Sequence, residues 1–248
     1  QTLTLDRTGQ KTELVLPAQR EDFCGLGVLC ETDAGERASC AVDIQKKLRV
    51  FRYGFLSDFS RAETSEADVL AMAKHHVNAV QFYDWSYRHD TLVAEFDDYT
   101  DMMCKPNSLE VIRRKIAACH HRGMRAVGYG AVYAASEAFA ANHPDWRLYA
   151  RAGEPLRFID VFAIMNLESS WREHIVSQYR AAVNAGFDGV HMDTYGFPKT
   201  ALDAEGSSVR LEDDFAPLIE QTRAALPEAT LVFNNVGGWP VERTMHAP

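Results

Sequence analysis

The chain has 248 residues, of which 46% are hydrophobic and 25% charged, and a formal net charge of −9 at pH 7. This composition is ordinary for a folded globular protein and excludes a largely disordered chain. The acidic excess disfavours nucleic acid as a partner, because phosphate binding needs clustered lysine and arginine. No apolar run approaches the ~18 residues that a membrane-spanning helix requires, so we expect no membrane partner.

The first 46 residues predict antiparallel β-strands. Short β-rich segments at 3–7, 12–18, 25–32 and 40–45 are separated by turns containing Gly, Asp and Glu. These strands are too few for a complete sandwich. We therefore interpret residues 1–46 as the C-terminal part of a β-sandwich domain, with a β extension packed on the main domain as the alternative.

From residue 47 the pattern changes to alternating strands and helices. Buried strands are predicted at 52–59, 78–85, 124–134, 187–196 and 230–238, and helices at 65–76, 106–123, 168–186 and 212–227. Repeated βα units with non-alternating apolar strands indicate a parallel sheet in an α/β fold.

Polar and aromatic side chains gather at the predicted carboxyl ends of these strands, which is the face where a (β/α)8 barrel places its active site. They are Asp58, Tyr83-Asp84-Trp85, Tyr129, Asp193-Thr194-Tyr195 and Asn234-Asn235. A doubly wound sheet is the competing fold, but no G-x-G-x-x-G motif follows any strand. We interpret residues 47–248 as the N-terminal part of a (β/α)8 catalytic barrel.

Strands one to five of this barrel are visible in the sequence. Three further βα units would need roughly 100 more residues. We therefore expect that the chain is truncated, processed, or completed by the remainder of the barrel or a second chain. The N-terminal QTLTLDRTGQK has no charged start followed by a long apolar core, so no signal peptide is expected there, although a mature secreted protein would look the same.

Asp193 is the main candidate for chemistry. It lies near the end of GFDGVHMDTYG (186–196), where the fourth strand presents its carboxyl end. A half-desolvated carboxylate there suits a nucleophile that attacks the anomeric carbon of a sugar, and a structural acid that caps a helix or binds loop amides is the alternative. Asp188, at the strand entrance, is interpreted as a turn or cap residue. His191 and Tyr195 flank Asp193 and are expected to hold a sugar or orient the carboxylate.

A second cluster, FYDWSYRHD (82–90), combines aromatic and charged side chains. Aromatic faces stack on pyranose rings and carboxylates accept hydroxyl hydrogen bonds, so substrate contacts are expected from Asp84, Trp85 and Tyr87; an aromatic-rich core loop is the alternative. The other residues expected to bind substrate are Tyr53, Asp58, Tyr129, Tyr133, Asn234 and Asn235.

The sequence lacks the motifs of several other enzyme classes. There is no G-x-S-x-G elbow, no H-E-x-x-H pair and no phosphate-binding loop, so no cofactor is expected. The cysteines match no zinc-binding spacing, no metal site is predicted, and we interpret all five as structural or incidental. They are Cys24, Cys30, Cys40, Cys104 and Cys119, the last of which is expected to be buried in a helix.

The sequence resembles glycoside hydrolase family 66, the dextranases and cycloisomaltooligosaccharide glucanotransferases. The resemblance rests on motifs in order from about residue 20 onward: AVDIQKKLRVFRYGFLSDF (41–59), NAVQFYDWSYRHD (78–90), GYGAVYAA (128–135), HPDWRLY (143–149) and GFDGVHMDTYG (186–196). It implies a retaining mechanism on α-1,6-glucans in a (β/α)8 barrel preceded by an immunoglobulin-like β domain. It also implies that Asp193 is the nucleophile and that a glutamate at the end of strand six is the acid/base.

No residue of this chain matches that glutamate, because the sequence stops before a sixth strand. Glu242 is the only acid after strand five, and its place in a loop makes it a poor substitute. The main interpretation is an endo-acting dextranase-like hydrolase, and the alternative is a cyclising α-1,6-transglucosylase. An alternative that is not an enzyme is a non-catalytic, glucan-binding fragment. Because dextran is an external polymer, an extracellular or periplasmic location is expected by analogy.

Overall fold

The computed structural model describes residues 22, 24–45 and 48–247. The chain divides into two compact units, Gln1–Val50 and Phe51–Pro248, each of which is described by itself. The boundary expected from the sequence, after residue 46, lies a few residues before this division.

The described part of the N-terminal unit contains an antiparallel hairpin. Strand β1 (Cys24–Glu31) pairs with β2 (Arg37–Ile44) in a register that runs from Cys24↔Ile44 to Glu31↔Arg37. At the turn, the Gly35 N–H donates to the Thr32 carbonyl at 2.8 Å, and Gly35 has a φ of 81°, which a residue without Cβ adopts readily. The hairpin agrees with two of the predicted strands. The other two, at 3–7 and 12–18, lie outside the described residues.

A five-stranded parallel sheet forms the centre of the C-terminal unit. Its strands are β3 (Tyr53–Leu56), β4 (Ala79–Phe82), β7 (Arg125–Ala131), β13 (Gly189–Asp193) and β16 (Thr230–Phe233). They lie side by side in chain order, and every neighbouring pair is parallel. A doubly wound sheet reverses its strand order at a switch point. No such reversal occurs among the described strands, and the predicted parallel α/β sheet is confirmed.

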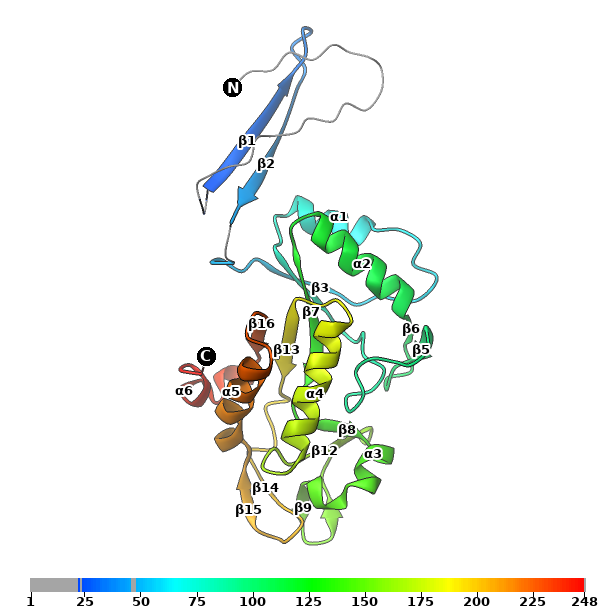
Figure 1. The fold of residues 1–248 in the computed structure, drawn as a ribbon, viewed down its shortest axis with the longest axis vertical. Helices are drawn as coiled ribbons and strands as arrows, with labels where there is room; N and C mark the ends of the chain where they lie inside the picture. The colour runs from blue at the N-terminus through cyan, green and yellow to red at the C-terminus, as the bar shows by residue number, and fades with distance from the viewer. Residues whose placement is uncertain (1–21, 23, 46–47, 248) are drawn as a thin grey trace. The chain divides into compact units, whose positions relative to one another are not determined.

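The main helices connect successive strands of this sheet, as Figure 1 shows. They are α1 (Ala67–Lys74), α2 (Leu109–His121), α4 (Trp171–Asn184) and α5 (Phe215–Ala225). Helix α1 packs against β3, α2 against β7, and α4 against β7 and β13. Shorter helical segments are α3 (Glu137–Asn142), α6 (Val241–Thr244) and the 3-10 turns at Pro144–Trp146, Leu211–Asp214 and Val236–Gly238.

Small antiparallel sheets occupy the connections that leave the carboxyl ends of β4, β7 and β13 (Figure 1). Strand β5 (Asp98–Thr100) pairs with β6 (Pro106–Ser108), and β8 (Ala134–Ser136) and β11 (Arg157–Phe158) both pair with β12 (Phe162–Ile164). The last small sheet contains β9 (Tyr149–Arg151), β10 (Glu154–Pro155), β14 (Thr200–Leu202) and β15 (Ser208–Arg210). The sequence analysis did not predict these short strands.

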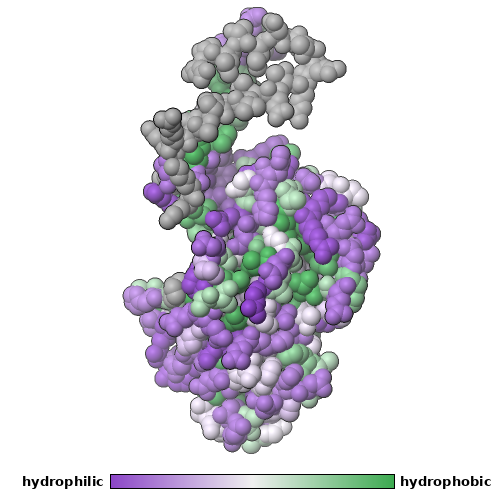
Figure 2. All heavy atoms as spheres, in the orientation of Figure 1, coloured by the Kyte–Doolittle hydropathy of each residue, from purple (hydrophilic) through white to green (hydrophobic). Residues whose placement is uncertain are grey.

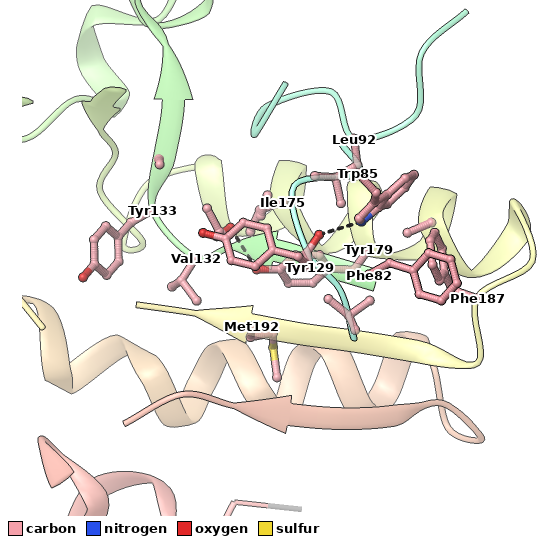
Figure 3. Close-up of a cluster of buried hydrophobic side chains, with 14 of the residues drawn as sticks. Phe82, Trp85, Leu92, Tyr129, Val132, Tyr133, Ile175, Tyr179, Phe187 and Met192 are labelled. Carbon is pink, nitrogen blue, oxygen red and sulfur yellow. Dashed lines mark hydrogen bonds between the residues drawn. The ribbon is translucent and has the colours of Figure 1, made fainter. Parts of the chain in front are cut away.

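The two sides of the central sheet differ in character, because alternate residues of a strand point to opposite sides. Val190 and Met192 of β13 are fully buried on the helix-facing side. Gly130 of β7 leaves room there for an aromatic ring, since a Cβ at this position would lie 2.7 Å from the Tyr179 ring of α4. Figure 3 shows this apolar cluster, in which Tyr179 and Trp85 lie beside the strands.

The opposite side of the sheet carries polar side chains. The strand register places Tyr53, Gln81, Tyr129, His191 and Asp193 on this side. His191 and Asp193 keep 13% and 17% of their side-chain surfaces exposed, whereas Gln81 is buried. The sequence GVHMD therefore separates an apolar, core-forming face from a polar face within one short strand.

Asp188 ties the entrance of β13 to its neighbours. Its Oδ2 accepts the Ala126 N–H of β7 at 2.7 Å and lies 2.8 Å from Nε2 of His120 in α2. Its carbonyl accepts the N–H of Thr230 in β16 at 2.8 Å. These contacts join two strands and a helix, in agreement with the structural role expected for Asp188.

The surface of residues 51–247 is mostly hydrophilic on the face that Figure 2 presents, with separate apolar patches between charged side chains. Cys119 is fully buried in α2, as predicted, and burial raises the pKa of its thiol to about 12. In the described part of the chain, no helix has both the length and the apolar character needed to cross a membrane.

Candidate active site

Asp193 ends β13 and is held by two neutral hydrogen-bond donors. The Tyr129 hydroxyl donates to Oδ2 at 3.0 Å, and the Asn234 side-chain amide donates to Oδ1 at 2.6 Å. Tyr129 comes from the neighbouring strand β7 on one side, and Asn234 follows β16 on the other. Because both donors come from adjacent parallel strands, the sheet itself fixes the orientation of the carboxylate.

A histidine and a tyrosine continue this network along the polar side of the sheet. His191 lies two residues before Asp193, with Nε2 4.0 Å from Asp193 Oδ1. Its Nδ1 is 3.1 Å from the hydroxyl of Tyr53 in β3. Burial lowers the pKa of His191, and the nearby Asp193 carboxylate opposes this shift. Asn234 and His191 therefore lie beside Asp193, and Tyr53 joins them through His191; contact of these three residues with a substrate stays a prediction.

A cavity of about 360 Å³ opens in front of Asp193. The loop after β4, the β5–β6 hairpin, the β11–β12 hairpin and the ends of β7 and β13 provide its walls. Its lining residues are Tyr83, Asp84, Ser86, His89, Asp101, Met102, Met103, Tyr129, Phe158, Ile159, Phe162, Asp193 and Tyr195. Four residues named from the sequence therefore line one cavity: Asp84, Tyr129, Asp193 and Tyr195.

Trp85 and Tyr133, both predicted to bind substrate, lie in the protein interior. Trp85 is fully buried and its Nε1 donates to the Tyr129 carbonyl at 3.0 Å (Figure 3). Tyr133 donates to the Phe197 carbonyl at 2.9 Å and accepts the N–H of Tyr195 at 2.7 Å. In this structure the two side chains support the strand β7 and the loop after β13, and protein covers the Trp85 ring.

The remaining predicted residues do not line the cavity. Tyr87 packs edge-on against Phe96 and carries the Arg88 guanidinium over its ring. Asp58 is exposed in the turn after β3, where its carbonyl accepts the Lys115 ammonium. Asn235 accepts the Thr244 hydroxyl at 3.0 Å. The Tyr87 and Asn235 side chains and the Asp58 carbonyl thus make contacts within the protein, and contact of these residues with a substrate stays a prediction.

Burial and the charge of Asp193 control the ionisation of the cavity-lining phenols. Burial raises the pKa of Tyr129 and of Tyr195, and the nearby Asp193 carboxylate adds to both shifts. Both hydroxyls therefore keep their protons and serve as donors. Burial also raises the pKa of Asp84, with a further contribution from the neighbouring carboxylate of Asp101.

Several cavity residues were absent from the predicted substrate-binding set. Tyr83 and His89 lie in the FYDWSYRHD cluster, but Asp84, Trp85 and Tyr87 were chosen from it. Asp101 is buried, and its Oδ1 accepts the N–H groups of Met103 and Lys105 at 2.8 Å each. The others are Ser86, Met102, Met103, Phe158, Ile159 and Phe162. One feature of the sequence could have identified these residues: they lie in the long connections that follow the second and third predicted strands.

The arrangement can present an ionised carboxylate to a neutral, hydroxyl-rich ligand. Donors fix Asp193 without neutralising it, and tyrosine and phenylalanine rings line the same cavity. Glu242, the weak candidate for the acid/base, is exposed on α6 and is not a lining residue. Among the described residues, no group of three or more His, Cys, Asp or Glu side chains could hold a metal ion.

Comparison with known proteins places the chain in a family. A model described as glycosyl hydrolase family 66 matches residues 3–247. The chain belongs to glycosyl hydrolase family 66. The resemblance found in the sequence motifs is therefore confirmed.

Two curated family 66 relatives are both cycloisomaltooligosaccharide glucanotransferases from Niallia circulans. They are 29% and 28% identical to this chain over 273 and 261 aligned residues, which cover 97% and 93% of it. The alignments cover only 28% and 27% of the relatives. The chain thus spans little more than a quarter of the length of these relatives.

One solved structure agrees with this family assignment, and a second shares the fold. A cycloisomaltooligosaccharide glucanotransferase from Paenibacillus sp., complexed with cycloisomaltoheptaose, superposes with a TM-score of 0.79 at 27% identity and covers 86% of this chain and 34% of that one. An α-galactosidase from Thermus thermophilus gives a TM-score of 0.50 at 16% identity, over 81% of this chain and 44% of that chain. The second similarity concerns the fold alone.

Proposed function

We propose that this chain carries the nucleophile of an α-1,6-glucan transglucosylase that forms cyclic isomaltooligosaccharides. The observation that carries the proposal is the Asp193 carboxylate, held by Tyr129 and Asn234 at the wall of a cavity lined by aromatic and polar groups. The names of the curated relatives and of the similar solved structure support the transferase. They favour the alternative drawn from the sequence over its main interpretation, the dextranase-like hydrolase.

In the proposed first step, an Asp193 oxygen attacks the anomeric carbon of a glucose unit. A bond forms between this oxygen and C1, the C1–O6 glycosidic bond breaks, and the leaving O6 takes a proton from a general acid. The negative charge on Asp193 is consumed as the covalent glucosyl ester forms. Tyr129 and Asn234 hold the attacking oxygens in place, which lowers the entropic part of the barrier.

In the second step, the bond between C1 and Asp193 breaks as a sugar hydroxyl attacks C1. The hydroxyl gives its proton to the group that acted as the acid, and the carboxylate of Asp193 is restored. If the hydroxyl belongs to the far end of the same glucan, the product is a ring; if water attacks, it is a linear sugar. The acid/base is expected from a glutamate on a strand outside the residues described, as the resemblance implies.

We further propose that the parallel sheet is part of a (β/α)8 barrel and that the N-terminal hairpin belongs to an immunoglobulin-like β domain. The strand order without reversal supports the barrel. The antiparallel pairing of β1 and β2 is compatible with the β domain. A large external glucan as substrate supports a location outside the cytoplasm.

The test of the nucleophile is Asp193→Asn in the intact protein. The neutral amide attacks poorly, so turnover of dextran should fall at least about 10³-fold, with an unchanged unfolding midpoint. The exposed Asp145→Asn serves as the matched control and should keep wild-type turnover. Turnover that survives in Asp193→Asn would remove Asp193 from the mechanism.

Product analysis separates the two enzymatic candidates. The wild-type protein is incubated with a long isomaltooligosaccharide, and the products are separated by mass. A cyclic product is lighter by one water molecule than the linear sugar of equal length. Rings are expected; if only linear sugars appear at all stages of the reaction, the hydrolase replaces the transferase.

A further inference from the structure

His89 is a buried polar residue at the cavity surface with one ring nitrogen left to bind a ligand. It lies in the loop after β4, lines the cavity that contains Asp193, and is only 8% exposed. Buried polar groups in proteins are nearly always hydrogen-bonded. An unpaired donor at such a position therefore points to a partner that arrives with the ligand.

Packing fixes the plane of the His89 ring. The ring lies parallel to Phe162 of β12, with centroids 4.6 Å apart and planes 4° apart. Tyr129 packs nearby at a centroid distance of 5.8 Å and a tilt of 51°. Because its faces meet aromatic neighbours, His89 can bind a ligand only through the edge that carries its nitrogens.

Tyr195 sets which nitrogen carries the proton. The Tyr195 hydroxyl lies 3.4 Å from Nδ1 of His89 and also makes a hydrogen-bonding contact with the side chain of Tyr129. A protonated phenol is a good donor, and burial together with the charge of Asp193 keeps Tyr195 protonated. With Tyr195 as the donor to Nδ1, the proton of the neutral imidazole resides on Nε2. No partner for Nε2 occurs in the described parts of the chain.

The imidazole is neutral at the pH at which most proteins work. Burial lowers the pKa of His89 to about 4, with a smaller opposing effect of Asp90. A neutral donor suits a sugar hydroxyl, whereas a cation would compete with the developing positive charge on the anomeric carbon. The residue thus offers one directed N–H group to the cavity.

We propose that His89 is a specificity residue whose Nε2–H donates a hydrogen bond to a hydroxyl of the glucose unit bound next to Asp193. This inference rests on the proposed function, because it takes a glucan as the ligand of the cavity. It assigns to His89 a contact with the substrate, and to Tyr195 the positioning role of fixing the His89 tautomer.

The test compares substrates and side chains together. Monodeoxy isomaltooligosaccharides that lack the 2-, 3- or 4-hydroxyl of the reacting glucose unit are assayed with the intact wild-type protein, His89→Asn and His89→Gln. The Gln amide reaches about as far as Nε2 and can keep the donor, whereas the shorter Asn amide reproduces only the Nδ1 position. Far-ultraviolet circular dichroism and the unfolding midpoint check the fold of each variant.

On the complete substrate, kcat/KM should fall about 10-fold to 100-fold in His89→Asn and less in His89→Gln. One monodeoxy substrate should show a similar loss with the wild type and no further loss with His89→Asn, because both changes remove the same hydrogen bond. A purely structural role would lower activity on all three deoxy substrates by the same factor, and that result would overturn the inference. If the wild type does not process the complete substrate, the proposed function itself fails, which is a different outcome.

Discussion

At the scale of single residues, the main property of the site is a carboxylate held by neutral groups. The ion-pair contact recorded for Asp193 in the described chain is His191, at 4.0 Å, and burial lowers the pKa of that imidazole. A lysine or arginine in place of His191 would stabilise the Asp193 carboxylate and weaken the attack of that carboxylate on carbon. Tyr129 and Asn234 orient Asp193 by hydrogen bonds that leave its charge available.

Tyr129→Phe tests this orientation. The substitution removes the hydroxyl that donates to Asp193 Oδ2 and keeps the ring. Hydrogen bonds to charged groups contribute about 1.5–3 kcal/mol, so kcat should fall about 10-fold to 100-fold. Tyr149→Phe is the matched control, because its hydroxyl bonds the Pro144 carbonyl near the surface, and its kcat should equal the wild-type value. Equal kcat values for both variants would show that Tyr129 does not orient the nucleophile.

His89 also makes stability depend on pH. The folded pKa is about 4 and the unfolded value 6.5, so between these values the unfolded chain binds the proton and the folded chain does not. The free energy of unfolding should therefore fall as pH drops from 6.5 to 4, by about 3 kcal/mol over the whole window. Asp214 has the opposite effect on the free energy of unfolding. Burial raises the pKa of Asp214 to about 6, so the folded chain binds this proton at a higher pH than the unfolded chain does.

The measurement that isolates His89 is the difference between the wild type and His89→Gln. Denaturant unfolding at pH 7 and pH 4.5 should show a smaller loss of stability for His89→Gln, since Asp214 titrates in both proteins. His121→Gln, at an exposed position of α2, should follow the wild type. A parallel pH dependence for the wild type and His89→Gln would contradict the lowered pKa.

At the scale of elements, β13 is the piece that positions the site, and its close fit to β16 is essential. Gly189 begins β13 opposite Thr230 of β16. A Cβ at Gly189 would lie 1.8 Å from the Thr230 carbonyl oxygen, and a backbone atom cannot move away as a flexible side chain can. The strand begins with glycine because only a hydrogen atom fits between these two backbones.

Gly189→Ala should separate β13 from β16 and also move Asn234, the donor to Asp193. We expect a loss of about 3 kcal/mol or more in the free energy of unfolding, measured by denaturant titration. Gly27→Ala in β1 is the control, because a Cβ there meets no atom within 4 Å. A loss below about 1 kcal/mol for Gly189→Ala would mean that the two strands do not approach as closely as described.

The sequence predicted the regular elements of the C-terminal unit well, because strong apolar runs alternate with helices that end at glycines such as Gly123 and Gly186. It also located Asp193, since a polar residue after a buried run marks a strand end. It did not separate Trp85, which is buried, from its neighbour Asp84, which lines the cavity. The short strands of the hairpins show no detectable alternation of apolar and polar residues. Their pairing depends on contacts between residues that are far apart in the sequence.

At the scale of the whole molecule, the central sheet has two edges. Strand β3 pairs only with β4, and β16 only with β13, among the described strands. The N–H of Thr230 donates to the carbonyl of Asp188, just before β13, and the N–H of Asn234 donates to the carbonyl of Met192 in β13. Because donors alternate along a strand, those of Leu231 and Phe233 point to the other edge. The proposed barrel would place a further strand there.

Hydrogen exchange in the intact protein tests the barrel. If a further strand pairs with β16, the amides of Leu231 and Phe233 should exchange at least about 100-fold more slowly than in a fragment of residues 51–248. The amide of Val190 in the sheet centre provides the internal reference in both samples. Rapid exchange of Leu231 and Phe233 in the intact protein would rule out a closed barrel at this edge.

The alternation along β13 also restricts how this segment can vary during evolution. Inserting or deleting one residue would exchange its two faces, turn Val190 and Met192 toward the cavity and force Asp193 against α4. Lineages that keep the chemistry should therefore accept substitutions in β13 but no change of its length. Length variation should accumulate instead in surface turns such as the one between β14 and β15, where nothing in the catalytic arrangement depends on the count of residues.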